Sequence, residues 1–229
     1  MIKISNVPCG YQHLFDKKDM VFVLLHKLLD NEQYRDYYLN KKIKQKLICL
    51  DNSCYELGES LDKKQLLLWA NKLQKAHPEA TVEIIIPDSY KNKEKTLKMM
   101  KSFLEEKESK KFKLMSVPQG VNDKELLDCL DEMLSIDRIN TIGLNKLWCK
   151  KTLQIAIWKV LSYRKDIHKL GLNNIAEWII DDRIKDFIRS ADSRRICQLI
   201  LGKEDIWEEN LTEEQCNIIK NMINEVDKW

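Results

Sequence analysis

Hydrophobic and polar positions alternate along the chain between two patterns. Short runs rich in apolar and β-branched residues predict strands, and longer segments with apolar residues at helical spacing predict helices. The predicted strands are Ile2–Val7, Leu47–Leu50, Thr81–Ile86, Phe112–Val117, Ile139–Leu144, Ile167–Leu172 and Phe187–Ile188. The predicted helices centre on Leu66–Leu73, Leu97–Leu104, Leu126–Leu134 and Ile155–Leu161. Strand and helix therefore follow one another in turn from about residue 47 to about residue 190.

This alternation predicts an α/β fold with crossover connections and a parallel sheet. Strand starts that recur about every 20 to 35 residues fit either a doubly wound sheet or a (β/α)8 barrel. The sequence shows seven strand signals, one fewer than the eight strands of a barrel. We nevertheless predict a compact TIM-type (β/α)8 barrel. Because no Ser-, Gly- or Pro-rich linker divides the sequence, residues 1–229 are expected to form one domain. Thr212 is the predicted N-cap of a closing helix over residues 212–228.

Composition and charge narrow the protein class. A hydrophobic fraction of 44% in 229 residues supplies a sizeable core and excludes a mainly disordered chain. The formal net charge of +3 excludes a histone-like basic protein. The longest apolar run, Met20–Leu25, is far shorter than the roughly 20 residues of a membrane span, so no membrane association is expected. Seven cysteines without a CxxC pair, and the lack of a signal peptide, predict a cytoplasmic protein without metal or other cofactor.

Polar residues follow most of the predicted strands. The carboxyl ends of parallel strands meet at one rim, where α/β proteins carry their reactive groups. The residues are Asp51, Asn52, Ser53, Asp88, Gln119, Gly120, Gly143, Gly171 and Asp192. Each aspartate could instead cap a helix, and Gln119-Gly120 could be a simple turn. Two carboxylates on one rim are nevertheless what double-displacement glycosyl transfer requires, because one attacks C1′ while the other moves a proton.

Six short motifs, in this order, resemble the tRNA-guanine transglycosylase superfamily. They are Leu50-Asp51-Asn52-Ser53, Pro87-Asp88, Val117-Pro118-Gln119-Gly120, Ile142-Gly143, His168-Lys169-Leu170-Gly171 and Arg189-Ser190-Ala191-Asp192-Ser193. The resemblance covers about residues 1 to 200, and it is to the short phage-encoded branch that inserts 7-deazaguanine bases into DNA. It implies a (β/α)8 barrel that exchanges guanine in DNA for a preQ0-type base through a covalent aspartyl-sugar intermediate. The modified bases would protect phage DNA from host restriction.

The resemblance also assigns roles to five residues. Asp192 matches the nucleophile, and Asp51 matches the general acid/base near the departing base. Asp88 matches the carboxylate that recognises the N1 and exocyclic amine edge of the purine, and Gln119 the amide that reads its carbonyl side. Gly143 matches the backbone position against which the base lies. A carboxylate that accepts from adjacent N–H donors suits a guanine-like edge.

The sequence departs from the tRNA enzymes in two respects. Their zinc subdomain is expected to be absent, because only Cys197 and Cys216 stand near the C-terminus, without a neighbouring histidine. Their acid/base motif usually runs Asp-Ser-Gly-Gly, whereas Asp51 is followed by Asn-Ser-Cys, which alters the floor of the pocket. Two alternatives stay open: a transglycosylase that acts on RNA, and a catalytically silent barrel that binds nucleic acid or a protein.

A nucleic-acid substrate calls for positive charge near the rim. The candidates are Arg194, Arg195, Arg189, Lys169 and Lys146, each of which could also be a solvated surface residue. The base would have to be flipped out of a duplex or lie in single-stranded DNA to reach a rim pocket. Trp148 could stack on a base or cover the barrel. The oligomeric state is left open.

Overall fold

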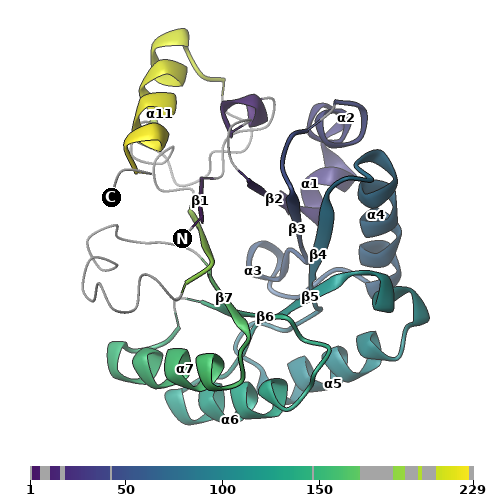
Figure 1. Cartoon of the computed structure of the whole chain (residues 1–229), viewed down its shortest axis with the longest axis vertical. Helices are drawn as coiled ribbons and strands as arrows, with labels where there is room; N and C mark the ends of the chain where they lie inside the picture. The colour runs from purple at the N-terminus through teal and green to yellow at the C-terminus, as the bar shows by residue number, and fades with distance from the viewer. Residues whose placement is uncertain are drawn as a thin grey trace.

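The computed structural model of the chain describes residues 2–5, 11–15, 19–41, 43–145, 147–170, 188–193, 201–202 and 210–226. Its strands form one parallel sheet in the order β1-β8-β7-β6-β5-β4-β3-β2 (Figure 1). The strands are β1 (Ile2–Ser5), β2 (Met20–Leu24), β3 (Leu47–Asp51), β4 (Thr81–Ile85), β5 (Lys113–Ser116), β6 (Thr141–Leu144), β7 (Asp166–Lys169) and β8 (Ser190–Ser193). The predicted α/β fold with a parallel sheet is thus confirmed.

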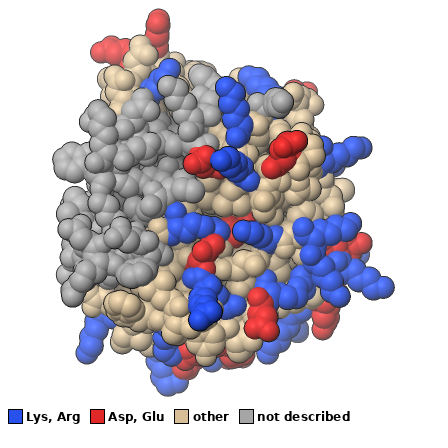
Figure 2. All heavy atoms as spheres, viewed as in Figure 1, with Lys and Arg blue, Asp and Glu red and all other residues tan. Residues whose placement is uncertain are grey.

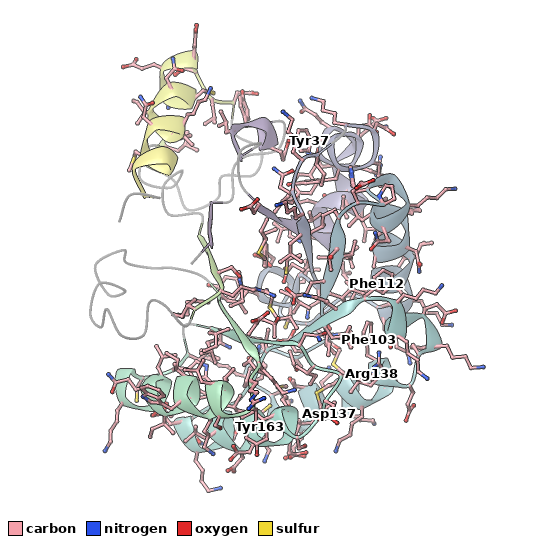
Figure 3. All side chains as sticks on the ribbon, viewed as in Figure 1. Tyr37, Phe103, Phe112, Asp137, Arg138 and Tyr163 are labelled. Atoms are coloured by element: carbon pink, nitrogen blue, oxygen red, sulfur yellow. The ribbon has the colours of Figure 1, made fainter. Side chains whose placement is uncertain are left out.

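Long helices line the outside of this sheet, whereas the short helix α3 lies inside its curl in the view of Figure 1. The helices of the described residues are η1 (Gln12–Phe15), α1 (Leu25–Asp30), α2 (Glu32–Asn40), α3 (Cys54–Leu57), α4 (Lys63–Ala76), α5 (Lys93–Leu104), η2 (Lys107–Lys111), α6 (Asp123–Leu134), α7 (Lys150–Ser162) and α11 (Glu213–Val226). Side chains fill the space between helices and sheet, where Phe103 on α5 and Phe112 before β5 are both buried (Figure 3). Arg138 donates to the carbonyl oxygen of Leu104 at 2.8 Å and thereby ties the loop before β6 to the end of α5.

The C-terminal helix α11 begins directly after Thr212, as the sequence predicts. The backbone N–H of Gln215 donates to the Thr212 hydroxyl, and the Gln215 side chain accepts from the Thr212 N–H. These two bonds form a capping box, which satisfies N–H groups that the first turn leaves unpaired. Tyr11 anchors this start of the helix, because its hydroxyl accepts from the N–H of Leu211 at 2.9 Å.

Two strands differ from the sequence prediction. The run at Met20–Leu24 was not assigned as a strand, yet it forms β2, and every residue in it is buried. Strands buried on both faces are continuously apolar, and β2 continues directly into α1 at Leu25 without a turn residue to mark the boundary. At the other end, β8 begins at Ser190, beyond the predicted run at Phe187–Ile188. Backbone pairing to β1 and β7 makes these polar residues a strand.

Contacts across the inner face show that the sheet curls. Phe22 on β2 stacks on His168 on β7 with ring centroids 5.7 Å apart. Five strand spacings of about 4.8 Å would separate these strands by about 24 Å in a flat sheet. The two ends of the sheet also approach each other, since Cα atoms of β1 lie within 8 Å of β2. No β1–β2 ladder is present among the described residues, so the closed barrel remains a prediction.

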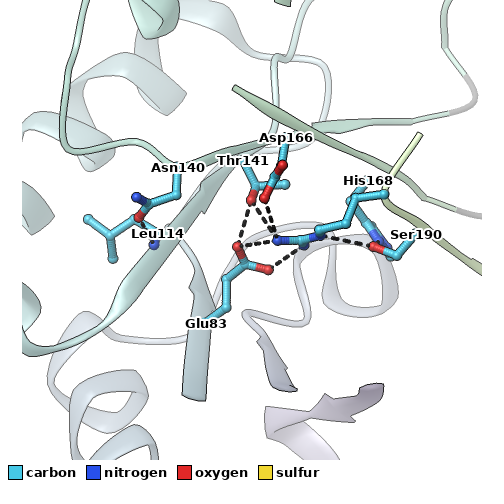
Figure 4. A network of polar contacts seen from close by, with 8 residues as sticks. Glu83, Leu114, Asn140, Thr141, Asp166, His168 and Ser190 are labelled. Atoms are coloured by element: carbon cyan, nitrogen blue, oxygen red, sulfur yellow. Dashed lines mark hydrogen bonds and ion pairs between the residues drawn. The ribbon is translucent and has the colours of Figure 1, made fainter. Parts of the chain in front are cut away.

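A polar network crosses the inside of the curled sheet (Figure 4). Arg189, just before β8, donates to both carboxylate oxygens of Glu83 on β4, at 3.0 and 2.6 Å. Thr141 on β6 donates to the same carboxylate, and Asp166 on β7 accepts from Arg189 at 3.3 Å. Because Glu83 is fully buried, these donors replace the water that its charge would otherwise bind.

The outer surface carries charges of both signs. On the face shown in Figure 2, Asp and Glu lie among the Lys and Arg side chains of the described residues. This mixture fits the small net charge of +3. Among the helices that the structure describes, none is long and apolar enough to cross a membrane.

Gly120 allows the loop after β5 to approach α6 closely. A Cβ atom at this position would lie 2.7 Å from Cβ of Glu125 and 2.8 Å from the backbone nitrogen of Leu126. We expect Gly120→Ala to lower the free energy of unfolding by about 1–3 kcal/mol, because backbone must move to make room. Urea unfolding measures this, with Val121→Ala as the control, since Val121 is 67% exposed. Equal stability of the two variants would contradict the prediction.

Candidate active site

The carboxyl-terminal edge of the sheet brings Asp88 and Gln119 together. Gln119, in the loop after β5, donates through Nε2 to Oδ2 of Asp88, in the loop after β4. Asn52, after β3, donates through Nδ2 to Oδ1 of Asp88 at 2.7 Å. All three side chains are buried. The two predicted base-binding side chains are therefore neighbours, and Asn52 joins them as a residue to which the sequence assigned no role.

Proline shapes both loops. The N–H of Ile86 still donates to Met115 on β5 at 2.8 Å, but Pro87 has no N–H and ends the ladder there. Asp88 follows directly, and its carbonyl oxygen accepts from the N–H of Ser60. The loop after β5 has the same order, with Pro118 before Gln119. In this way the two strand ends place a carboxylate and an amide side by side.

Burial dominates the electrostatics of the pair. It raises the pKa of Asp88, and the hydrogen bonds from Gln119 and Asn52 oppose this rise because they stabilise the carboxylate. Burial also raises the pKa of the Cys54 thiol, and the nearby charge of Asp88 adds to the effect. Cys54 is therefore a neutral thiol at pH 7 and a weak nucleophile.

Asp51 is the last residue of β3, and its carboxylate holds the following turn. Oδ2 accepts from the N–H of Ser53 at 3.0 Å, where the backbone takes a left-handed conformation with φ 63°. The buried Ser53 hydroxyl lies 2.8 Å from Nδ1 of His26 and accepts from the His26 N–H. Asp51 thus holds the turn that leads into α3, whose N-cap residue is Ser53, and does not itself cap the helix. Its proposed role as acid/base is compatible with this bond, since the residue is only half-buried.

Gly143 lies on β6 where no side chain would fit. A Cβ atom would stand 2.9 Å from Cγ2 of Val117, 3.0 Å from Cδ1 of Leu170 and 3.3 Å from the sulfur of Met115. The close packing of these apolar side chains explains the glycine without a ligand. Contact between this backbone and a base stays a prediction.

Two of the predicted nucleic-acid contacts have other partners. Lys169 is buried, and its Nζ donates to the carbonyl oxygen of Asn145 at 2.9 Å. Arg189 pairs with Glu83 and precedes β8, so it lies at the amino end of the strands, opposite Asp88. The positions of Lys169 and Arg189 argue against a contact with nucleic acid, because each charged group interacts with polar groups inside the protein. A basic residue close in sequence to a rim motif need not lie at the rim. Arg189 precedes its strand, and a residue before a strand lies at the opposite end of the sheet from a residue that follows it.

For the remaining predicted site residues, the structure describes either the backbone alone or nothing. Asp192 is in β8, where its Cα pairs with Ile4 of β1, but its side chain is not among those described. Lys146, Arg194 and Arg195 lie outside the described residues. Among the described residues no group of three or more His, Cys, Asp or Glu side chains could hold a metal ion.

Aromatic rings stand beside the buried pair. Tyr55 on α3 is 51% exposed, and its ring meets that of Tyr90 edge-on at 5.9 Å between centroids. The ammonium of Lys91 lies 5.4 Å from the centre of the Tyr90 ring, and the Lys91 N–H donates to Oε1 of Gln119. These tyrosines were missed by the sequence analysis, although each stands within three residues of a rim motif. Trp148, by contrast, is buried, which fits the interpretation that it covers the sheet.

Comparisons with known proteins inform the fold. No protein-family model matches the chain, and no curated protein matches its sequence. A crystal structure of oxaloacetate acetylhydrolase is similar with a TM-score of 0.50 and 10% identity over 100% of this chain and 92% of that one. The same enzyme bound to the inhibitor 3,3-difluorooxalacetate gives a TM-score of 0.51 and 9% identity over 100% and 91% of the two chains. Similarity at this low identity concerns the fold alone.

Proposed function

We propose that the chain is a DNA-guanine transglycosylase that exchanges guanine for a 7-deazaguanine base. The observation that carries the proposal is the buried Asp88 carboxylate beside the Gln119 amide at the carboxyl edge of the sheet. Ligand sites of parallel α/β folds occupy this edge. Asp51 ends the neighbouring strand β3, so the proposed acid/base stands on the same edge.

The hydrogen-bonding pattern of the pair supports a guanine-like ligand. Because Oε1 of Gln119 accepts from the N–H of Lys91, its Nε2 must be the group that faces Asp88. The two residues thus present acceptors next to a donor. Guanine carries the complementary order along one edge, namely an amine N–H, the N1–H and a carbonyl oxygen. Adenine offers an acceptor at N1 and would leave Asp88 without a donor there.

The proposed reaction has two displacements. A carboxylate oxygen of Asp192 attacks C1′, the bond from C1′ to N9 of guanine breaks, and Asp51 donates a proton to the departing base. The deazapurine then enters, and Asp51 accepts the proton from its N9. This nitrogen attacks C1′ and releases Asp192, so the proton and the bonding electrons balance. Asp88 and Gln119 orient each base in turn.

The tyrosines support a substrate whose base has left the stack. Exposed aromatic rings stack on unpaired bases, and the rings of Tyr55 and Tyr90 stand next to the proposed pocket. Such contacts suit a flipped or single-stranded guanine. We extend the proposal to a closed (β/α)8 barrel, since the curled sheet brings β1 close to β2.

Release of labelled guanine tests the proposed function. DNA that carries labelled guanine should lose its label when the protein and a preQ0-type base are added together. The same assay with labelled RNA distinguishes the two polymers. Retention of label in both polymers with every deazapurine tried would contradict transglycosylation. Nucleic-acid binding that survives replacement of Asp51, Asp88 and Asp192 by Asn would then support a barrel that only binds.

A second prediction concerns Asp88. We expect Asp88→Asn to raise the KM for the free base about 10- to 100-fold, because a hydrogen bond to a charged acceptor is lost. The new amide would also point an N–H₂ group at a donor of Asn52 or Gln119. Steady-state kinetics measure the change, with Asp128→Asn as the control, since Asp128 pairs with Lys124 on the surface. An unchanged KM would remove Asp88 from base recognition.

A further inference from the structure

Three hydrogen bonds determine the orientation of the Asn52 side chain. Its Nδ2 donates to the carbonyl oxygen of Ile86 at 2.8 Å and to Oδ1 of Asp88 at 2.7 Å. Its Oδ1 accepts from the N–H of Cys54 at 2.9 Å. A flipped amide would set its oxygen against two acceptors, so only the observed orientation is possible. Asn52 therefore always presents a donor to Asp88.

Two of the three departures from the Asp-Ser-Gly-Gly pattern, Asn52 and Cys54, meet at Asp88. Asn52 hydrogen-bonds the carboxylate, and the thiol of Cys54 lies close enough to feel its charge. A serine at position 52 has a shorter side chain and only one donor, so it could not bridge Ile86 and Asp88 together. The altered floor of the pocket is thus the immediate environment of the proposed base-recognising carboxylate.

The amides of Asn52 and Gln119 favour one state of Asp88. Each donates to a different oxygen, and a proton on either oxygen would weaken one of the two bonds. The other titratable groups around Asp88 are Cys54 on α3, Cys129 on α6 and Asp51 at the end of β3. Burial raises the pKa of Cys129 to about 12, and Cys129 also feels the charge of Lys93 on α5. Both thiols are neutral at pH 7, so the effect of burial on the pKa of Asp88 is opposed by hydrogen bonds, chiefly those from Gln119 and Asn52.

We propose that Asn52 is a positioning residue of the base pocket, which holds Asp88 ionised with its remaining lone pairs available to the N–H edge of the base. Asn52 thereby sets the lowest pH at which a base binds. This role rests on the proposed function. Protonation removes one acceptor site of Asp88, which then cannot accept from two N–H groups of the base in addition to Asn52 and Gln119, so base binding is lost as the pH falls through the pKa of Asp88. Loss of the Asn52 donor raises that pKa and moves the loss of binding to higher pH.

Two measurements on Asn52→Leu and Asn52→Ser test the proposal. Carbon-13 NMR of labelled aspartate follows the Asp88 carboxyl in the ligand-free protein, with Asp88→Asn identifying its signal. We expect the titration midpoint to rise by about one pH unit in both variants. The acidic limb of kcat/KM for a preQ0-type base should move to higher pH by the same amount. The control Asn71→Leu removes an amide that donates to the Leu67 carbonyl oxygen within α4, away from Asp88, and should shift neither.

The outcomes separate this proposal from the proposed function. An unmoved Asp88 midpoint in a folded variant, with an unmoved acidic limb, overturns the role of Asn52. If Asn52→Leu does not fold, the Asp88 midpoint and the acidic limb of kcat/KM measured on Asn52→Ser test the proposal instead. If the midpoint moves while the parent protein exchanges no base, transglycosylation fails but the control of Asp88 by Asn52 stands.

Discussion

Replacing Asp192 with alanine is expected to abolish base exchange, with a fall in kcat of at least about 10⁴-fold. Under the proposed mechanism Asp192 forms the bond to C1′, and no covalent intermediate can form without its carboxylate. Single-turnover release of labelled guanine measures the loss. Trapping on a denaturing gel should show a DNA–protein adduct in the parent and none in the variant. DNA binding and the melting temperature should stay close to those of the parent.

The backbone at Asp192 is part of the sheet. It lies in β8, whose Cα atoms pair with β1 on one side and with β7 on the other. Ser190, two residues earlier, lies 2.7 Å from Nδ1 of His168. The backbone that carries Asp192 is thus held from both sides. An adduct that persists in Asp192→Ala would contradict the assignment and move the nucleophile to Asp51, which Asp51→Ala would then test.

Replacing Arg189 with methionine is expected to lower the free energy of unfolding by about 3–5 kcal/mol. The change leaves the carboxylate of Glu83 fully buried without its cation, and Thr141 alone cannot compensate for the charge. Urea unfolding measures the loss. The double variant Glu83→Gln/Arg189→Met is the control, because it removes the buried charge together with its partner and should recover part of the stability. A loss below about 1 kcal/mol would mean that Arg189 contributes little to the interior.

This second prediction does not depend on the proposed function. Arg189 stands three residues before Asp192 in one resemblance motif, and the sequence makes it a candidate for positive charge near the rim. The structure turns its side chain to the inside of the sheet, across three strands, toward Glu83. The sequence offers no signal for this pair, because the residues are far apart along the chain and each is of a type that is usually exposed.

The sequence and the structure agree best where short-range pattern decides. Helical spacing of apolar residues predicts the helix around Leu66–Leu73, and α4 buries Leu66, Leu67, Trp69, Ala70 and Leu73. Thr212 caps α11 through a residue three positions on. Pro87 and Pro118 end their strands by lacking an N–H, so the strand-end positions of Asp88 and Gln119 can be found from their neighbours, whereas their base-binding roles come from the family resemblance. Such features depend on residues within a few positions of one another, which is why periodicity and capping rules find them.

The amino-acid sequence by itself determined the alternation of strand and helix, the parallel sheet, and the polar strand ends at Asp51, Asp88 and Gln119. Only the tertiary structure decided that Asn52 hydrogen-bonds to Asp88 and that the ring of Tyr55 contacts that of Tyr90. It also decided that Lys169 and Arg189 interact with polar groups inside the protein. The physical reason is the curl of the sheet. Local propensity acts over a few residues, whereas the partner of a buried charge is chosen by desolvation and by which strands the curl brings face to face.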